Sequence, residues 1–480
     1  MQIHLPSPYR ALSSILAGLS AAALLGSCQS PQPAAEAETR QPNVIVIFTD
    51  DQGYQDIGVF GSPDIKTPHL DRLAGEGMRF TDFYSADPVC TPSRAALLTG
   101  CYPHRVGGLS VLWPDSTVGL NPDETTLAEM LKANGYATAC IGKWHLGHLP
   151  QFLPMAHGFD SYFGIPYSND MSIGKGMKLA ESLTLREGVM RESMWEAKKN
   201  WVPLMRGAEV IEYPADQSTL TQRYTEEALQ FIRQNKEQPF FLYLPHTMPH
   251  IPLYASPQFE GKSEIGLYGD CIEEIDWSVG QIADELRKLG LADNTLLIYT
   301  SDNGPWDLKG NATDKVKGNQ NRRIGGSAKP LRGFKFSTWE GGMRVPAIMW
   351  WPGTIPANSE CSSVTATIDI MPTIADLSAG SKFPNHKTDG VSLAPVLLDQ
   401  SSAHLSERPY FYRRKAVRVG NWKGVLNGNS GMLELYNLSN DPGEKKNVAN
   451  ANPELVLKLA DLLHQHQRDL IQNKRPPGSI

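Results

Sequence analysis

Cysteine is scarce in this sequence, and its few copies are far apart. None of the six cysteines forms a CxxC pair, so the sequence gives no support to zinc-binding or thioredoxin-type chemistry. Five of them follow the N-terminal segment: Cys90, Cys101, Cys140, Cys271 and Cys361. Five scattered thiols are also a poor disulfide framework, so we expect one of them to have a separate purpose.

An excess of charge of one sign is also missing. The 480 residues include 45 basic and 51 acidic side chains, a formal net charge of −6, with no long run of either sign. Without a basic surface to neutralise phosphates, nucleic acid is not an expected partner. A single basic pocket would still be enough for a small anionic substrate. With 41% hydrophobic residues, the chain can build a large domain plus a smaller one.

Only the N-terminus carries a long apolar run. Arg10 precedes apolar residues 11–25, and small residues lead up to Cys28. This pattern is typical of a signal peptide, not of a membrane span. We expect residues 1–27 to be a lipoprotein signal peptide, Cys28 to be lipidated and residues 28–41 to be a flexible tether. The protein would then lie in the periplasm or at the outer membrane, touching the membrane only through its lipid anchor; the alternative is a plain secretory signal.

Four apolar segments rich in β-branched or aromatic residues are each followed at once by polar side chains. They are 43–49, 137–141, 240–244 and 295–301. Such runs are typical of strands buried on both faces of a parallel sheet. Helical patterns lie between them, at 70–76, 126–134, 221–236 and 272–289. The alternation predicts an α/β fold, an open sheet with helices on both sides, which binds ligands beyond the carboxyl ends of its strands.

Oxygen ligands gather at that predicted edge. Asp50 and Asp51 follow the first strand, and Asp302 and Asn303 follow the last. Carboxylate and amide oxygens suit a hard divalent cation such as Ca²⁺ or Mg²⁺. Either pair alone could equally consist of helix caps or turn residues. Two such pairs at one sheet edge favour a metal site.

Cys90 lies just before a short helix expected to begin around Pro92. A helix N-terminus offers free N–H groups and favours negative charge, so it suits a nucleophile that handles an anion. The alternative is a buried structural cysteine.

The segment Cys90-Thr91-Pro92-Ser93-Arg94 resembles the C-x-P-S-R signature of type I sulfatases. The resemblance runs from Pro42 to about Glu444 and includes four further motifs in family order: 95–100 (AALLTG), 142–147 (GKWHLG), 301–305 (SDNGP) and 335–342 (KFSTWEGG). Segments 152–154 and 164–170 are most similar to the arylsulfatase A subgroup. The resemblance implies an alkaline-phosphatase-like large mixed or parallel sheet flanked by helices, and oxidation of Cys90 to Cα-formylglycine by a maturation enzyme.

Matching this sequence to the family's motifs gives each candidate residue an implied role. Arg94 and Lys143 would orient the formylglycine hydrate, and His145 would pair with one of its hydroxyls. His250 and Lys335 would contact the sulfate and the leaving oxygen. Ser168 would supply a further polar contact, and the implied Ca²⁺ ligands are Asp50, Asp51, formylglycine 90, Asp302 and Asn303.

These roles describe one reaction. One hydroxyl of the hydrate attacks sulfur, and His250 protonates the departing alcohol with help from Lys335. His145 then deprotonates the second hydroxyl, and sulfate is expelled by elimination. His246 and Trp113 are further candidates for substrate contact: His246 could equally just pack, and Trp113 could stack on a sugar or simply cover the core.

Two domains are expected: a catalytic domain at 42–365 and, at 366–480, a C-terminal subdomain with a four-stranded antiparallel sheet and the helix 453–471. Residues 368–377 could still be a helix of the first domain. The predicted substrate is a sulfated glycan, with galactose or N-acetylgalactosamine sulfate indicated by the subgroup, or a small sulfate ester. The alternatives are a phosphomonoesterase or phosphodiesterase of the same superfamily and a non-catalytic glycan-binding lipoprotein.

Overall fold

The computed structural model describes residues 41–306, 325–378, 384–399, 405, 407–428 and 430–480. The predicted signal peptide, the lipidated Cys28 and all but the last residue of the tether lie outside these ranges. Within them, no helix is both long enough and apolar enough to cross a bilayer.

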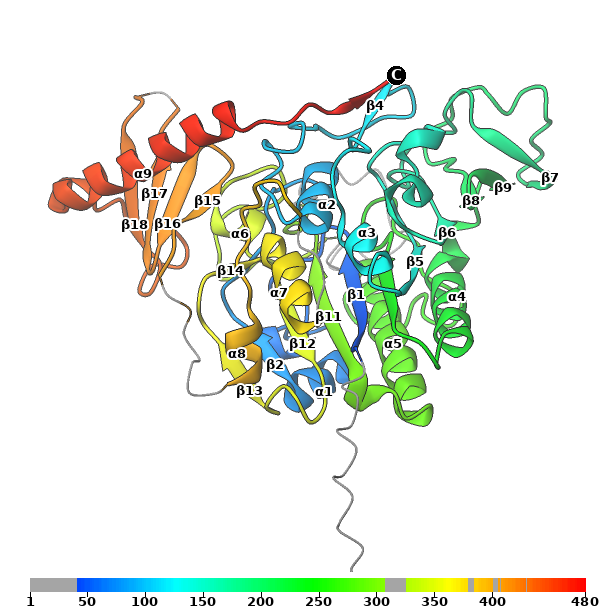
Figure 1. The fold of residues 1–480 in the computed structure, drawn as a ribbon, viewed down its shortest axis with the longest axis horizontal. Helices are drawn as coiled ribbons and strands as arrows, with labels where there is room; N and C mark the ends of the chain where they lie inside the picture. The colour runs from blue at the N-terminus through cyan, green and yellow to red at the C-terminus, as the bar shows by residue number, and fades with distance from the viewer. Residues whose placement is uncertain (1–40, 307–324, 379–383, 400–404, 406, 429) are drawn as a thin grey trace, which may run out of the picture. The chain divides into compact units, whose positions relative to one another are not determined.

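The predicted strands form the centre of one large sheet (Figure 1). Strand β1 pairs in parallel with β10 on one side, Val44 opposite Phe241, and with β11 on the other, Asn43 opposite Thr295. All residues of these three strands are buried, which is why their sequences are continuously apolar. The four central strands are β11 (Thr295–Ser301), β1 (Asn43–Thr49), β10 (Phe240–Pro245) and β5 (Ala137–Ile141).

Further strands extend the sheet to eleven and make it mixed. Strand β12 (Ala347–Trp350) runs antiparallel to β11, and β8 (Leu204–Arg206) runs antiparallel to β6 (Ser161–Gly164). The predicted α/β class with a large mixed sheet is confirmed. The remaining members are β2 (Met78–Phe80), β13 (Ser359–Cys361), β9 (Glu209–Tyr213) and β7 (Lys178–Leu185).

Two groups of helices flank the sheet. The first consists of α1 (Pro68–Glu76), α4 (Leu220–Gln234) and α5 (Leu267–Lys288), in which α5 contacts both others. The second consists of α2 (Cys90–Thr99), α3 (Leu127–Lys132) and α7 (Ile370–Leu377), in which α2 contacts both others. Two further helices are short, α6 (Glu340–Met343) and α8 (Ala394–Leu398).

Helix α2 begins at Cys90 itself, two residues before the predicted start at Pro92. Proline is tolerated in the first helical turn because the N–H that it lacks would have no acceptor within the helix. Cys90 is therefore the first helical residue rather than the residue before the helix.

The C-terminal part has the predicted four-stranded antiparallel sheet and long helix (Figure 1, orange and red). Leu459 and Leu463 of the helix are buried in one cluster with Leu435 of the sheet. These elements are β15 (Tyr410–Tyr412), β16 (Ala416–Val419), β17 (Trp422–Leu426), β18 (Leu433–Asn437) and α9 (Pro453–Gln472). The last strand, β19 (Gly478–Ser479), pairs with β4 (Val118–Gly119).

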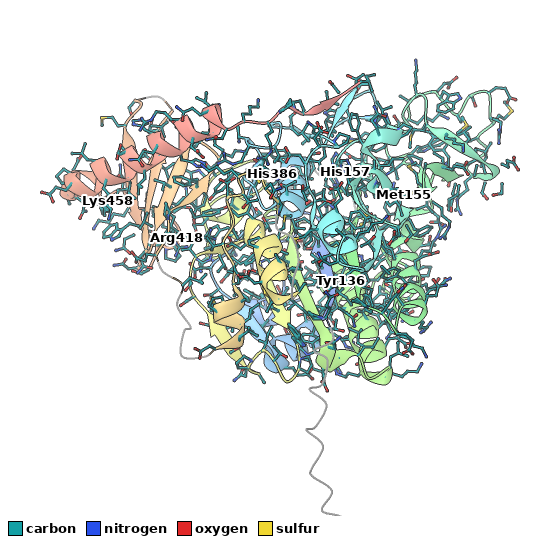
Figure 2. The ribbon with its side chains drawn as sticks, in the orientation of Figure 1. Tyr136, Met155, His157, His386, Arg418 and Lys458 are labelled. Atoms are coloured by element: carbon teal, nitrogen blue, oxygen red, sulfur yellow. The ribbon has the colours of Figure 1, made fainter. Side chains whose placement is uncertain are left out.

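A buried polar network joins this sheet to α6 and to residues 82–84, which follow β2. Glu340 accepts hydrogen bonds from the hydroxyls of Tyr84 (2.5 Å) and Tyr412 (2.6 Å), and Lys423 lies 3.0 Å from the same carboxylate. Arg418, labelled in Figure 2, pairs with Asp82 at 2.6 Å. These donors and the ammonium of Lys423 offset the free-energy cost of burying the Glu340 carboxylate.

The expected domain boundary at residue 365 stays a prediction. Residues 40–480 form one compact unit by their contacts. Just past the expected boundary, β14 (Thr365–Ala366) pairs with β3 (Phe83–Tyr84), and Ile370 and Ile374 of α7 belong to the core of the large sheet.

Candidate active site

The carboxylates that follow β1 and β11 meet at the carboxyl edge of the sheet. The Asp302 amide donates to the carbonyl of Thr49 (3.0 Å), and the Asp51 amide donates to an Asp302 carboxylate oxygen (3.1 Å). Carboxylate oxygens of Asp50, Asp51 and Asp302 all lie within 4.8 Å of one another, and all three residues are buried. The parallel register of β1 and β11 brings the two pairs together.

Asn303 adds an amide oxygen to this cluster. Its Nδ2 donates to Asp51 Oδ1 (2.7 Å), while its buried Oδ1 has no hydrogen-bond partner among the described residues. Leaving a buried carbonyl oxygen unpaired is costly, and a metal ion is one of the partners that removes the cost. The four candidate ligand residues are three carboxylates and one amide, so all of their donor atoms are oxygens. This set fits Ca²⁺ or Mg²⁺.

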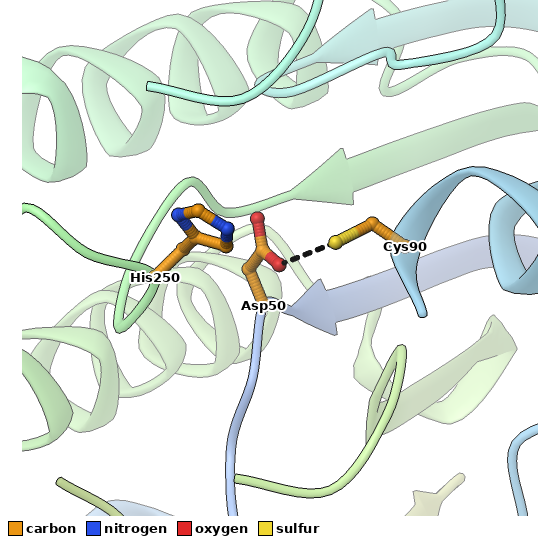
Figure 3. Close-up of side chains that lie close together, drawn as sticks. All are labelled: Asp50, Cys90 and His250. Carbon is orange, nitrogen blue, oxygen red and sulfur yellow. Dashed lines mark hydrogen bonds between the residues drawn. The ribbon is translucent and has the colours of Figure 1, made fainter. Parts of the chain in front are cut away.

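Cys90 lies against the carboxylate cluster. Its Sγ is 3.5 Å from Asp50 Oδ1 (Figure 3) and 3.6 Å from Lys335 Nζ. Burial, reinforced by the charge of Asp50, raises the pKa of the Cys90 thiol well above its ordinary value, although Lys143 and Lys335 oppose this shift. The unmodified thiol is therefore protonated at neutral pH and a weak nucleophile.

Three buried cations surround the carboxylates. Arg94 Nη2 is 2.7 Å from Asp302 Oδ2, and Lys335 Nζ is 2.7 Å from Asp51 Oδ1. Lys143 Nζ pairs with Asp50 and lies 2.8 Å from the Ser168 hydroxyl. Three carboxylates against three cations give a neutral cluster, so a bound divalent cation would leave a net charge of about +2. That charge favours an anionic substrate.

The pKa values of Asp50 and Asp302 are shifted in opposite directions. Burial raises the pKa of Asp302 to about 7, and the charge of Asp50 adds to this effect. Burial would also raise the pKa of Asp50, but the charges of Lys143 and Arg94 hold it well below its ordinary value. The repulsion between Asp50 and Asp302 contributes to the raised pKa of Asp302 after burial, and a bound cation would offset that repulsion.

The hydrogen bond of His145 fixes which ring nitrogen can act as a base. Its Nε2 lies 3.0 Å from the Leu112 carbonyl, which can only accept, so Nε2 carries the proton. Its buried Nδ1 has no hydrogen-bond partner among the described residues. Burial and the charge of Lys143 hold the pKa of His145 well below its ordinary value. The ring is therefore neutral, and Nδ1 keeps a free lone pair.

Whereas the ring of His145 is held through Nε2, the ring of His250 is held through Nδ1. Its Nδ1 lies 2.6 Å from the Ile251 carbonyl and 2.9 Å from Asn169 Oδ1, so Nδ1 is the donor. Its Nε2 lies 3.7 Å from Asp51 Oδ2, and Figure 3 shows the ring beside Asp50 of the carboxylate cluster. Burial and Lys335 hold the pKa of His250 well below its ordinary value.

Asn169 is a supporting residue of the site for which the sequence motifs predict no role. Its Nδ2 donates to Gln217 Oε1 (2.9 Å) and to the Pro252 carbonyl (2.9 Å), which leaves Oδ1 directed at His250. Asn169 therefore fixes the orientation of the His250 ring. The one available signal was its place beside Ser168 in the segment 164–170.

The remaining candidates are placed differently. His246 is buried, with its ring centroid 6.4 Å from that of Tyr224 and no hydrogen-bond partner for either nitrogen among the described residues. Burial lowers its pKa to about 3, so it packs as a neutral ring. Trp113 is 53% exposed and directly follows Leu112, whose carbonyl contacts His145.

Comparison with known proteins gives the family. The sulfatase family matches residues 42–381, and the C-terminal region of N-sulphoglucosamine sulphohydrolase matches residues 334–472. The chain belongs to the type I sulfatase family. It is therefore a sulfatase enzyme, and its expected alkaline-phosphatase-like architecture is the one its solved neighbours share.

Several individual sulfatases are similar over most of their length. N-acetylgalactosamine-6-sulfatase from Sus scrofa is 37% identical, over 95% of this chain and 90% of that protein. Arylsulfatase G from Mus musculus is 40% identical, over 75% of this chain and 70% of that protein. The solved structure of Ps i-CgsB in complex with k-i-k-neocarrahexaose has a TM-score of 0.74 and 31% identity, over 91% of this chain and 94% of that one.

Proposed function

We propose that this sulfatase removes sulfate from a sulfated sugar, using formylglycine made from Cys90 and a Ca²⁺ ion, with Mg²⁺ as the alternative metal. The observation that carries the proposal is the position of Cys90, 3.5 Å from the carboxylate cluster and 3.6 Å from Lys335, with a thiol too basic to ionise. A residue so placed needs chemical modification to become a good nucleophile.

Asp50, Asp51, Asp302 and Asn303 would hold the metal, with residue 90 completing its shell. Ca²⁺ would supply positive charge for the sulfate oxygens, and formylglycine hydrate would supply two hydroxyls, one to attack sulfur and one to release sulfate. Arg94 and Lys143 hold the carboxylates in place through Asp302 and Asp50. Lys143 also donates to Ser168, which orients the ammonium within the site.

The two histidines suit different steps. The free lone pair of His145 Nδ1 can accept a proton from a hydroxyl at residue 90, as release of sulfate requires. His250 Nε2 lies 3.7 Å from Asp51 Oδ2, beside the carboxylate cluster, where the negative charge of a bound sulfate ester would favour its protonation. It can then donate that proton to the leaving alcohol, beside the ammonium of Lys335.

The proposed substrate is a sulfate ester of galactose or N-acetylgalactosamine within a glycan. Support comes from the names of similar proteins, an N-acetylgalactosamine-6-sulfatase and a sulfatase solved with a neocarrahexaose. The alternative of a phosphoesterase rests on shared fold alone, since the phosphonate monoester hydrolase that resembles this chain is 18% identical with a TM-score of 0.60.

Parallel assays with 4-nitrophenyl sulfate, 4-nitrophenyl phosphate and a panel of galactose and N-acetylgalactosamine sulfates test the proposal. We expect kcat/KM for the aryl sulfate to exceed that for the aryl phosphate by at least about 100-fold, and one position of sulfation to be preferred among the sugars. A preference for the phosphate would overturn the proposal. Equal kcat/KM values on every sugar sulfate would contradict the proposed galactose or N-acetylgalactosamine sulfate substrate.

Metal removal is expected to lower the unfolding temperature, because it leaves three buried carboxylates without the cation. Ca²⁺ at 100 times its Kd would add about 2.7 kcal/mol to the free energy of unfolding. Scanning fluorimetry in EDTA, Ca²⁺ and Mg²⁺ measures the effect. Asn303→Ala should reduce the shift, whereas Asp64→Asn, at an exposed site, should not. Identical unfolding temperatures in EDTA and in both metals would contradict the metal site.

We also propose that the chain is exported, lipidated at Cys28 and held in the periplasm or at the outer membrane, and that a maturation enzyme oxidises Cys90. The support is the N-terminal sequence pattern and the C-x-P-S-R motif. In cell fractionation, Cys28→Ala should move the protein from the membrane to the soluble fraction. An unchanged membrane fraction would count against the lipid anchor.

A further inference from the structure

Exposed large aromatic side chains are rare among the described residues, and two of them flank Lys335 of the candidate active site. Among the described residues, the exposed Phe and Trp side chains are Trp113, Phe334 and Phe336. The two phenylalanines flank Lys335, and Trp113 follows Leu112, whose carbonyl holds His145. Of these three, Phe336 is the one with a ring contact to Trp306 among the described residues, and Trp306 lies against His250. An exposed apolar ring in that position indicates a ligand surface.

Trp306 and Phe336 form an aromatic pair beside Lys335 and His250, the two residues proposed to meet the leaving oxygen. The Trp306 ring has its centroid 5.6 Å from that of His250, and Lys335 Nζ lies 4.6 Å from the Trp306 centroid. Phe336 packs edge-on against Trp306 at 5.6 Å. Trp306 therefore contacts both groups that are proposed to meet the departing oxygen.

Folding alone does not account for Phe336. Its backbone has φ of 74°, a region that favours glycine and costs a bulky residue about 1 kcal/mol or more. Its side chain is 55% exposed, so little of this cost is recovered by burial. A strained backbone carrying an exposed ring beside an active site is typical of a functional position.

We propose that Trp306 and Phe336 form the subsite for the alcohol part of the substrate, binding the apolar C–H face of the sugar ring that carries the sulfate. This inference rests on the proposed function, because it places the leaving oxygen between Lys335 and His250. The ring carbon that bears this oxygen is one bond further out and must lie beside the aromatic pair. Aromatic rings suit the C–H face of a pyranose because that face is apolar and slightly positive.

Phe336→Ala is the direct test, and Phe334→Ala is its matched control. Both remove an exposed phenyl next to Lys335, but no ring contact joins Phe334 to Trp306 among the described residues. Phe336→Gly serves as a second variant, since glycine fits the positive φ and removes the ring without backbone strain. The readouts are KM for the sugar sulfate that the wild type hydrolyses fastest and the inhibition constant of inorganic sulfate.

We expect KM to rise about tenfold in both Phe336 variants, with the inhibition constant of inorganic sulfate unchanged within about twofold and Phe334→Ala close to wild type. An unchanged KM, or an equal rise in Phe334→Ala, would overturn the subsite. A parallel loss of inorganic sulfate binding would show that the ring acts through Lys335 instead. If the wild type hydrolysed no sulfate ester, the proposed function itself would fail, and the subsite with it.

Discussion

Replacing Cys90 by alanine is expected to lower kcat/KM for sulfate esters by at least about 10³-fold, because residue 90 supplies the attacking oxygen. Cys90→Ser should also turn over poorly, unless the host converts serine to formylglycine. Serine has a single hydroxyl and, once sulfated, no second one to expel the sulfate. Both variants should fold, since the new side chains are no larger than the thiol that they replace.

Unfolding temperature and a second cysteine variant provide the controls. Cys361→Ala changes another buried free cysteine, on β13, away from the carboxylate cluster. It should keep activity close to wild type. Cys90→Ala that retained more than about a tenth of wild-type activity would contradict a nucleophile at residue 90.

Replacing His250 by alanine is expected to harm sugar sulfates far more than nitrophenyl sulfate. A sugar alcohol is a poor leaving group and needs a proton, whereas nitrophenolate can leave without one. We expect a loss in kcat/KM of about 10²-fold or more for the sugar sulfate and less than about tenfold for the aryl sulfate. Asn169→Ala should show the same contrast more weakly, because Asn169 only orients the His250 ring.

His145→Ala serves as the comparison for this contrast. His145 acts after the S–O bond has broken, so its loss should lower kcat for both substrates about equally. Enzyme with sulfate bound at residue 90 should accumulate. Intact mass after rapid quenching detects that species. An equal loss on both substrates in His250→Ala would remove its role as general acid and leave it as a sulfate-binding residue.

The central strands were predictable because burial on both faces makes their sequences continuously apolar. The predicted ranges of β1, β5 and β11 match the structure to the residue, and the polar residues after them meet at one edge. Helix starts were less certain: α5 begins at Leu267, before its apolar periodicity is evident at Ile272. The strands that widen and mix the sheet are short, and a run of three or four residues carries little pattern.

The charged residues that the structure brings together at this site were predictable from motifs, but the residues that orient them were not. Asn169 lies 81 residues from His250, and Trp306 lies 56 residues from it, so only folding brings them together. The exposure of Phe336 and its positive φ are also products of the fold. His246 was a candidate because it lies four residues before His250, but in the structure it packs in the interior against Tyr224.

Mass spectrometry of the tryptic peptide containing residue 90, from active enzyme, tests the central claim most directly. Oxidation of cysteine to formylglycine replaces sulfur by oxygen and removes two hydrogens, so the peptide should be about 18 Da lighter than its sequence mass. The modified fraction should rise in proportion to specific activity across preparations. Full activity in a preparation whose residue 90 is entirely unmodified cysteine would contradict the account.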